Sequence, residues 1–271
     1  MRKPWHPLTL LVITVPGVCL GQSIEQQSQD GGGSFVDRFA RLDTKRWYIS
    51  DGWSNSPHQN CTWQKANIQV DGSAELTLSD RAGANRPFSC AEMQSTAYFG
   101  YGTYEVRMRA APGPGTVSAF FTFVGPPHGR PHNEIDFEFL GKDRNSVFLN
   151  YFVDGAKHER TIKFDHDATA SSQDYAFEWL PNSLRWFVNG RLVREATKDR
   201  GDLIPGHMQK IYLSIWNGVG WDQEAWLGRF EYPGHPLVAT YEWVAFTRMG
   251  ESCQFPSSIV CTLSGASGRI P

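Results

Sequence analysis

The stretch Asn133-Glu134-Ile135-Asp136-Phe137-Glu138-Phe139-Leu140-Gly141 carries an acid at every second position, with large apolar residues between the acids. Side chains of a β-strand point alternately to the two faces of a sheet, so a strand here places Glu134, Asp136 and Glu138 on one face. The apolar residues share the other face and can enter a core between two sheets. The segment therefore predicts a strand of a β-sandwich with only acids on its open face.

Three carboxylates on one face are costly as pure structure. Two of them about 5.5 Å apart repel by about 3 kcal/mol at an effective dielectric constant of 20, which corresponds to about two pKa units. One carboxyl is therefore expected to keep its proton near neutral pH while another is ionised. Retaining glycosidases use such a pair, with carboxyl groups about 5–5.5 Å apart. Because Cα atoms four residues apart in a flat strand lie about 13 Å apart, the spacing permits this geometry without establishing it.

Two other interpretations of the acidic face are possible from the sequence. A solvated strand face usually interleaves basic residues, since adjacent like charges destabilise a sheet, and here none is interleaved. A metal site could combine the acids with His128 and His132, but histidines at this spacing share a face on a helix. Gly129 and Pro131 between them disfavour a helix. The paired acids of a glycosidase are favoured over both alternatives.

The rest of the chain also predicts strands. Its 271 residues suffice for one large all-β domain or two small domains. Strand-length runs separated by turn residues fill 35–248, and Asn189-Gly190 between two apolar runs indicates a hairpin. In 102–109 the apolar Tyr104, Val106 and Met108 alternate with Glu105 and two arginines, so that strand should bury one face only. We find no sustained helical period, and a single all-β sandwich fits best.

Composition narrows the range of partners. A formal net charge of −2 gives no basic footprint for nucleic acid. The 10 Trp, 9 Tyr and 17 Phe suit either a β core or stacking on apolar sugar faces.

The N-terminal segment predicts export. Arg2 and Lys3 precede an apolar run, 8–20, that is too short to span a bilayer, and a small-residue cleavage site follows at 19–21. We assign 1–21 as a signal peptide and the polar, Gly-rich 22–34 as a flexible tether. Cys19 as a lipid attachment site is the alternative. The protein is expected to be secreted or periplasmic, without a membrane span.

The cysteines support export. Five are present, and removal of Cys19 leaves Cys61, Cys90, Cys253 and Cys261. An even number in an exported chain suggests two disulfides, for which the sequence allows three connectivities. We favour the neighbour pairings, Cys61 with Cys90 and Cys253 with Cys261, the latter in a Ser/Gly-rich tail, 249–271. A zinc site is the competitor, but no pair has the CxxC spacing.

The motif Glu134-Ile-Asp-Phe-Glu138-Phe-Leu-Gly-Lys-Asp143 resembles the active-site strand of glycoside hydrolase family 16, above all of the bacterial lichenases, which are endo-1,3-1,4-β-glucanases. It lacks the extra residue of laminarinase-type members. The resemblance covers about 35–248 and includes 50–55, 60–63, 99–108, 120–126, 175–179, 215–218 and 226–228. The chain is also similar to secreted bacterial glycanases that shorten exopolysaccharides such as succinoglycan.

This resemblance implies a β-jelly-roll sandwich of two antiparallel sheets with a concave substrate cleft. Glu134 would be the nucleophile, Glu138 the general acid/base, and Asp136 would tune both. The pair Cys61–Cys90 matches a disulfide of the family. Six residues match positions that contact the substrate in lichenases: Asn55, Glu92, Phe121, Asn150, Trp216 and Trp226.

The chain departs from lichenases at several cleft positions. Gln94 stands in place of an arginine, Phe152 in place of a tyrosine and Ser214 in place of an asparagine, while Trp221 falls in a short insertion. Catalysis as implied by the resemblance needs no cofactor or metal. Lichenases hold a structural calcium, but Glu242 stands where they have an aspartate that helps to hold it, which weakens the expectation of that ion here.

We expect a monomeric enzyme that acts on a polysaccharide, hydrolysing β-glucosyl linkages inside a mixed-linkage β-1,3-1,4-glucan or a succinoglycan-type polymer. One alternative is a non-catalytic glycan-binding jelly-roll protein, but such a protein should lack one of the two glutamates. The other is a transglycosylase that uses the same residues.

Overall fold

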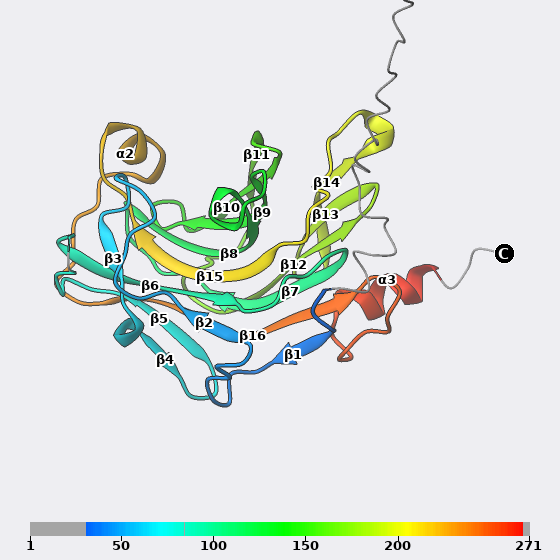
Figure 1. The fold of residues 1–271 in the computed structure, drawn as a ribbon, viewed down its shortest axis with the longest axis horizontal. Helices are drawn as coiled ribbons and strands as arrows, with labels where there is room; N and C mark the ends of the chain where they lie inside the picture. The colour runs from blue at the N-terminus through cyan, green and yellow to red at the C-terminus, as the bar shows by residue number, and fades with distance from the viewer. Residues whose placement is uncertain (1–30, 84, 268–271) are drawn as a thin grey trace, which may run out of the picture.

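The computed structural model describes residues 31–83 and 85–267, which form two packed β-sheets (Figure 1). The predicted signal peptide and residues 22–30 of the predicted tether lie outside the described residues. Residues 31–34 are attached to the domain, since the N–H of Gly32 donates to the carbonyl of Tyr98 at 2.7 Å. No helix within the described part of the chain is long and apolar enough to cross a membrane.

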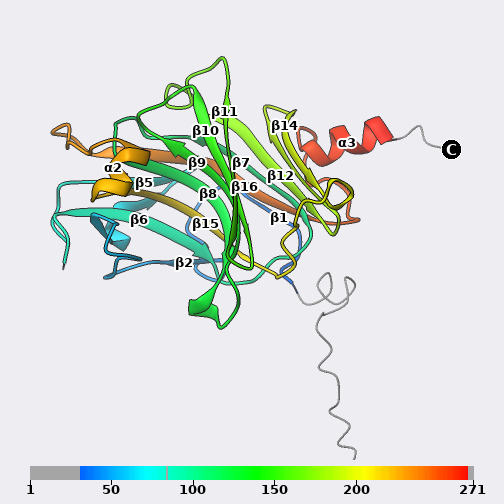
Figure 2. The same ribbon diagram turned by 90° about the horizontal axis from the view of Figure 1, so that it is seen from above.

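One sheet, called here the cleft sheet, has the spatial strand order β11-β10-β9-β8-β15-β6-β2, with β3 beside β6. Its strands are β2 (Trp47–Ile49), β3 (Cys61–Trp63), β6 (Phe88–Ser95), β8 (Thr116–Val124), β9 (Asn133–Leu140), β10 (Ser146–Val153), β11 (Ala156–Lys163) and β15 (Lys210–Asn217). Seen from above, the strands from β10 to β6 lie side by side in this order (Figure 2).

The second sheet, called the outer sheet, has the order β14-β13-β12-β7-β16-β5-β4, with β1 beside β16. Its strands are β1 (Phe35–Asp37), β4 (Ile68–Val70), β5 (Ala74–Leu78), β7 (Gly102–Arg109), β12 (Gln173–Leu180), β13 (Ser183–Val188), β14 (Arg191–Thr197) and β16 (Leu237–Arg248). Every described pairing in the two sheets is antiparallel except that of β3 with β6. The two antiparallel sheets confirm the predicted sandwich.

The core lies between the sheets and is largely aromatic. Ile135, Phe137 and Phe139 of β9 are at most 2% exposed, as the alternation predicts. The ring of Phe137 packs on Phe177 of β12, with ring centroids 6.4 Å apart, and so joins the cleft sheet to the outer sheet. Each such buried side chain contributes about 1.5–3 kcal/mol. This packing fixes which face of β9 is buried and leaves the acids on the other face.

The predicted hairpin at Asn189-Gly190 is confirmed. It joins β13 to β14, and both of its turn residues have positive φ, 48° and 78°. Such a turn matches the twist of the strands that it connects, which explains why Asn-Gly is favoured there.

Strand β7 departs from the expectation of one buried face. Its three apolar residues are buried, but Glu105 on the opposite face is also only 3% exposed. Residues of the C-terminal tail cover it: the hydroxyl of Ser258 and the N–H of Ile259 donate to the Glu105 carboxylate at 2.6 and 2.8 Å. The expectation is wrong at Glu105 because the tail adds a second layer over this sheet.

Two short helices were not foreseen, α2 (Trp221–Leu227) and α3 (Ile259–Ser267), beside the 3₁₀ turns η1 (Lys65–Asn67), η2 (Pro126–His128) and η3 (Lys198–Arg200). In Figure 1, α2 rises above the left side of the cleft sheet and α3 lies at the opposite end of the molecule. Both favoured disulfides are confirmed: Cys61–Cys90 joins β3 to β6, and Cys253–Cys261 ties α3 to the segment after β16.

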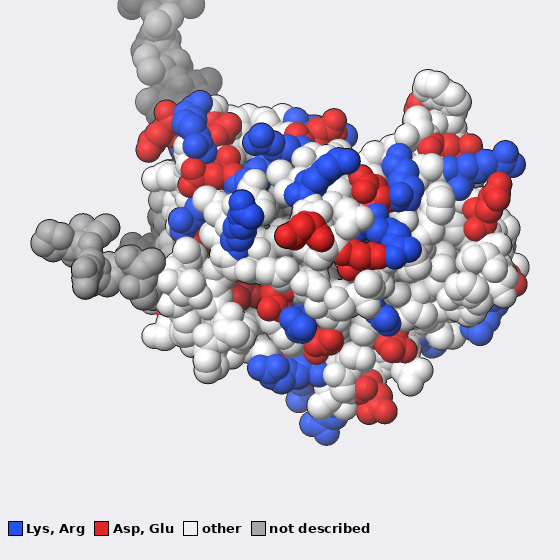
Figure 3. Space-filling model, turned by 180° about the vertical axis from the view of Figure 1, so that it is seen from behind, with Lys and Arg blue, Asp and Glu red and all other residues white. Residues whose placement is uncertain are grey.

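On the face opposite the view of Figure 1, neither positive nor negative side chains form a patch of one charge. Basic and acidic side chains are intermixed there (Figure 3). This distribution agrees with the formal net charge of −2 and gives no basic stripe on that face.

Candidate active site

The three acids of β9 lie in the middle of the cleft sheet, between β8 and β10. Pairing places Glu134 between Phe123 and Phe152, and Glu138 between Ala119 and Phe148. Three parallel rows of side chains therefore cross the open face of the sheet, each with one acid. Three of the four residues that flank the two glutamates are aromatic.

Asp136 occupies the central row, between Phe121 of β8 and Asn150 of β10. It is 3% exposed, and Asn150 is 4% exposed. Burial raises the pKa of Asp136 well above its ordinary value, and the charges of Glu134 and Glu138 and a hydrogen bond to Glu134 raise it further. The neutral form of Asp136 is therefore favoured by its position between the two glutamates.

Glu138 is the second acid with a raised pKa. Burial, followed by the charge of Glu134, raises the pKa of Glu138 from 4.5 to about 8. It therefore carries a proton at neutral pH, as a general acid must. Glu134 and Glu138 are four residues apart on β9 and line the same cleft, where the charge of Glu134 acts on Glu138.

A cleft of about 610 Å³ lies over this face and is lined by all three acids. Four of the six expected substrate contacts also line it: Asn55, Glu92, Phe121 and Trp216. The cleft thus brings residues from β6, β8, β9 and β15 together, as the resemblance implies.

Glu92 is held inside the cleft wall. It is 4% exposed and accepts a hydrogen bond from the Ser50 hydroxyl at 2.6 Å. Burial raises the pKa of Glu92 to about 7, against the opposing effect of hydrogen bonds from Ser50 and Asn55. Asn55 is fixed in turn by the indole N–H of Trp63, which donates to its side-chain oxygen at 2.9 Å. These hydrogen bonds hold the side chains of Glu92 and Asn55 in fixed positions in the cleft wall.

The remaining two expected contacts, Asn150 and Trp226, lie beside the lining. Asn150 is buried next to Asp136 in the central row. Trp226 of α2 packs edge-on against Phe148, with centroids 5.5 Å apart, and lies 6.4 Å from Trp216. Trp226 therefore stands over the row that contains Glu138, at the edge of the cleft.

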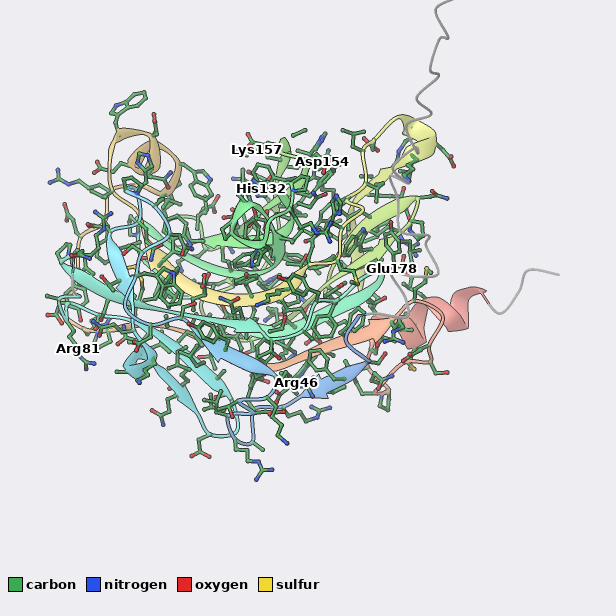
Figure 4. The ribbon with its side chains drawn as sticks, viewed as in Figure 1. Arg46, Arg81, His132, Asp154, Lys157 and Glu178 are labelled. Carbon is green, nitrogen blue, oxygen red and sulfur yellow. A yellow bond between two sulfur atoms is a disulfide. The ribbon has the colours of Figure 1, made fainter. Side chains whose placement is uncertain are left out.

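His132 is a site residue that the sequence suggests only as a metal ligand. Its Nε2 lies 2.6 Å from Glu134 Oε2, so the ring can donate to the carboxylate. The ring stacks on Phe152 at 4.1 Å and meets Phe123 edge-on at 5.3 Å. Figure 4 shows His132 above the cleft sheet, away from Arg46, Arg81 and Glu178. Its position two residues before Glu134 was the available signal, because a period of two places both on one face.

Neither histidine of the alternative metal site is arranged as a ligand. His128 accepts the N–H of Gly125 through Nδ1 at 3.2 Å, whereas His132 contacts Glu134. Within residues 31–83 and 85–267, no three His, Cys, Asp or Glu side chains are grouped to hold a metal ion.

Glu242, on the outer sheet, does not suit calcium. Its carboxylate accepts Nε of Arg107 at 2.9 Å, and the same guanidinium donates to Asp174 at 2.9 Å. The guanidinium charge beside Glu242 would repel a divalent cation. The Glu242 carboxylate therefore already has a cationic partner, which does not favour a calcium ion at this position.

Comparison with known proteins identifies the family of the chain. The pattern of glycosyl hydrolases family 16 matches residues 55–234. The endo-1,3-1,4-beta-glycanase ExoK of Rhizobium meliloti is 44% identical over 236 residues, 86% of this chain and 86% of that protein. A beta-glucanase of Bacillus subtilis is 41% identical over 241 residues, 88% of this chain and 96% of its own. A solved Bacillus licheniformis beta-glucanase matches with a TM-score of 0.74 and 42% identity, over 80% of this chain and 98% of that chain. With its paired acids in an open cleft, the chain belongs to glycosyl hydrolases family 16 and is a glycoside hydrolase.

Proposed function

We propose that the protein is an endo-acting, retaining hydrolase of β-glucosyl linkages in a mixed-linkage β-1,3-1,4-glucan or a related exopolysaccharide. The observation that carries this proposal is Glu138, whose pKa is raised to about 8, on the same open strand face as Glu134. An acid that keeps its proton beside a second carboxyl is the combination required for a retaining double displacement. The names of the relatives support the choice of polymer.

In the first step, the Glu134 carboxylate attacks the anomeric carbon while the bond from that carbon to the glycosidic oxygen breaks. Glu138 gives its proton to the departing oxygen, so the released chain leaves as an alcohol. The other product is an ester of Glu134 with the sugar. Asp136 is hydrogen-bonded to Glu134, so a change in the charge of Glu134 during this step changes the pKa of Asp136.

In the second step, water attacks the anomeric carbon and gives a proton to Glu138, and the Glu134 carboxylate leaves. The acid is thus restored, and two inversions retain the anomeric configuration. The open cleft supports cleavage inside a chain, because both ends of a polymer can extend beyond it.

We further propose that the protein works outside the cytoplasm as a monomer and needs no cofactor. The two disulfides support an oxidising compartment. The predicted signal peptide supports the same assignment.

The test is product analysis of wild type and Glu134→Gln on barley β-glucan, laminarin, xyloglucan and succinoglycan. Wild type should shorten one polymer rapidly, with the β-anomer as the first product in NMR spectra, and Glu134→Gln should be inactive. Release of monosaccharide alone would contradict endo action, and transfer products longer than the substrate would indicate a transglycosylase. A wild type that binds a glycan but cuts none would leave only the glycan-binding alternative.

A further inference from the structure

The central row of the cleft sheet extends well beyond the acids. From Asp136 it passes through Phe121 and Tyr212 to Gln94, and then to Tyr48 on the edge strand β2. Neighbouring strands lie about 4.8 Å apart, so the four steps span roughly 19 Å. Tyr48 therefore lies on the cleft face, several sugar residues away from the catalytic pair.

Tyr48 and its neighbour Trp53 are exposed rather than part of the core. Tyr48 is 48% exposed and Trp53 is 38% exposed, whereas Trp47, the preceding residue on β2, is 1% exposed on the opposite face. The two exposed rings stack on each other, with centroids 6.3 Å apart and planes 26° apart. Trp53 also lines the cleft. The stacked pair thus continues the aromatic floor of the cleft to the sheet edge.

Polar groups suited to sugar hydroxyls adjoin this pair. Gln94, next to Tyr48 in the row, accepts hydrogen bonds at its Oε1 from Lys210 at 3.2 Å and from Tyr212 at 3.3 Å. These bonds orient the amide through its oxygen, which leaves its nitrogen as a donor. An aromatic face beside an oriented amide is the combination that binds a pyranose, whose ring has an apolar face and a polar rim.

We propose that Tyr48, stacked on Trp53, forms a distal subsite that binds a β-glucosyl residue of a long substrate chain. This inference rests on the proposed function and specifies how the same cleft recognises a polymer. Because the subsite lies four strands from Asp136, only chains that reach it gain its binding energy. It therefore favours polymers over short oligosaccharides through KM.

The experiment compares wild type, Tyr48→Ala and Tyr48→Phe on barley β-glucan and on a short aryl β-glycoside that occupies only the subsites nearest the acids. Tyr48→Ala should lower kcat/KM on the polymer about threefold to tenfold, the loss expected for one aromatic stack, mainly through KM. The short substrate should be unaffected, and Tyr48→Phe, which keeps the ring, should resemble wild type on both. Leu192→Ala is the matched control, because Leu192 is 47% exposed on β14 of the outer sheet.

Equal losses on both substrates, or no loss on the polymer, would overturn the subsite. Electrophoresis through a gel containing barley β-glucan separates this failure from failure of the proposed function. If wild type cuts nothing, the proposed hydrolysis fails. Weaker retardation of Tyr48→Ala than of Tyr48→Phe in the gel would still show weaker binding to the glucan and support the subsite. Equal retardation of these two variants would refute it.

Discussion

Replacement of Glu138 by glutamine should stabilise the fold at pH 8 and leave it almost unchanged at pH 4.5. The pKa of Glu138 is about 8 in the folded protein and 4.5 in its ordinary state. Between these values the folded protein keeps a proton that the unfolded chain releases. Unfolding therefore releases a proton, and the contribution of Glu138 to stability falls as the pH rises through this window. Below pH 4.5 both states are protonated, and a neutral glutamine imitates them.

The magnitude follows from the two pKa values. The difference between 4.5 and about 8 corresponds to at most about 5 kcal/mol at pH 8. Glu138 lines an open cleft, and water there moderates both burial and repulsion. We therefore expect about 2 kcal/mol, which raises Tm by about 4–8 °C for a domain of this size.

The assay is thermal unfolding of wild type and Glu138→Gln, followed by circular dichroism at pH 4.5, 6, 7 and 8. Asp199→Asn serves as control, because Asp199 is exposed on the outside of the domain. The Tm difference between Glu138→Gln and wild type should grow steadily with pH, while the control shows no such trend. A Tm difference that is the same at all four pH values would refute the assignment of a retained proton to Glu138.

Three further predictions concern the surroundings of the site and the outer sheet. His132→Phe keeps a ring but removes the donor to Glu134, so it should lower kcat/KM. His132→Gln, which keeps a donor, should lower it less, and equal losses in the two variants would assign the ring a packing role only. Because Arg107 already pairs with the Glu242 carboxylate, we expect no calcium ion there, and EDTA should leave Tm unchanged within about 1 °C. A clear drop in Tm that added calcium reverses would show that an ion is bound. Cys253→Ser removes the disulfide that holds the C-terminal tail, so the tail should become sensitive to protease. The value of kcat/KM should not change, because the tail covers the outer sheet and not the cleft. A reduced kcat/KM would instead indicate a link from the tail to the cleft.

The parts of the fold that depend on local pattern could be predicted. The alternation in β9 gave the buried and the open face, because a strand has a period of two whatever surrounds it. The turn at Asn189-Gly190 could be predicted because a turn with positive φ at both central residues favours these residue types.

The helices and the covered face of β7 could not be predicted, for a physical reason. Helix α2 has only seven residues, too few for a helical period to show. Helix α3 begins where Glu105 accepts the N–H of Ile259, a contact between residues 154 positions apart. Such a cap is made by the tertiary fold, so neither the helix nor the burial of Glu105 has a local signal.

The site was predictable only to the extent that one strand carries it. The acids share a strand, so their common face followed from spacing. The rows that cross the sheet depend on register between strands that are distant in sequence, such as Gln94 opposite Tyr48 and Tyr212. The distal subsite therefore becomes visible only in the structure.

The same features explain why the sheet tolerates three acids on one strand. Glu138 retains a proton at neutral pH and the pKa of Asp136 is raised, so the repulsion expected of three ionised carboxylates is reduced. Lys157 of β11 partly offsets the rise in the Glu138 pKa, which keeps that proton transferable. The retained proton makes the folded state less stable as the pH rises, and it is also the proton that the leaving oxygen needs. A variant stabilised by removal of the carboxyl must therefore lose the acid step, because one group causes both effects.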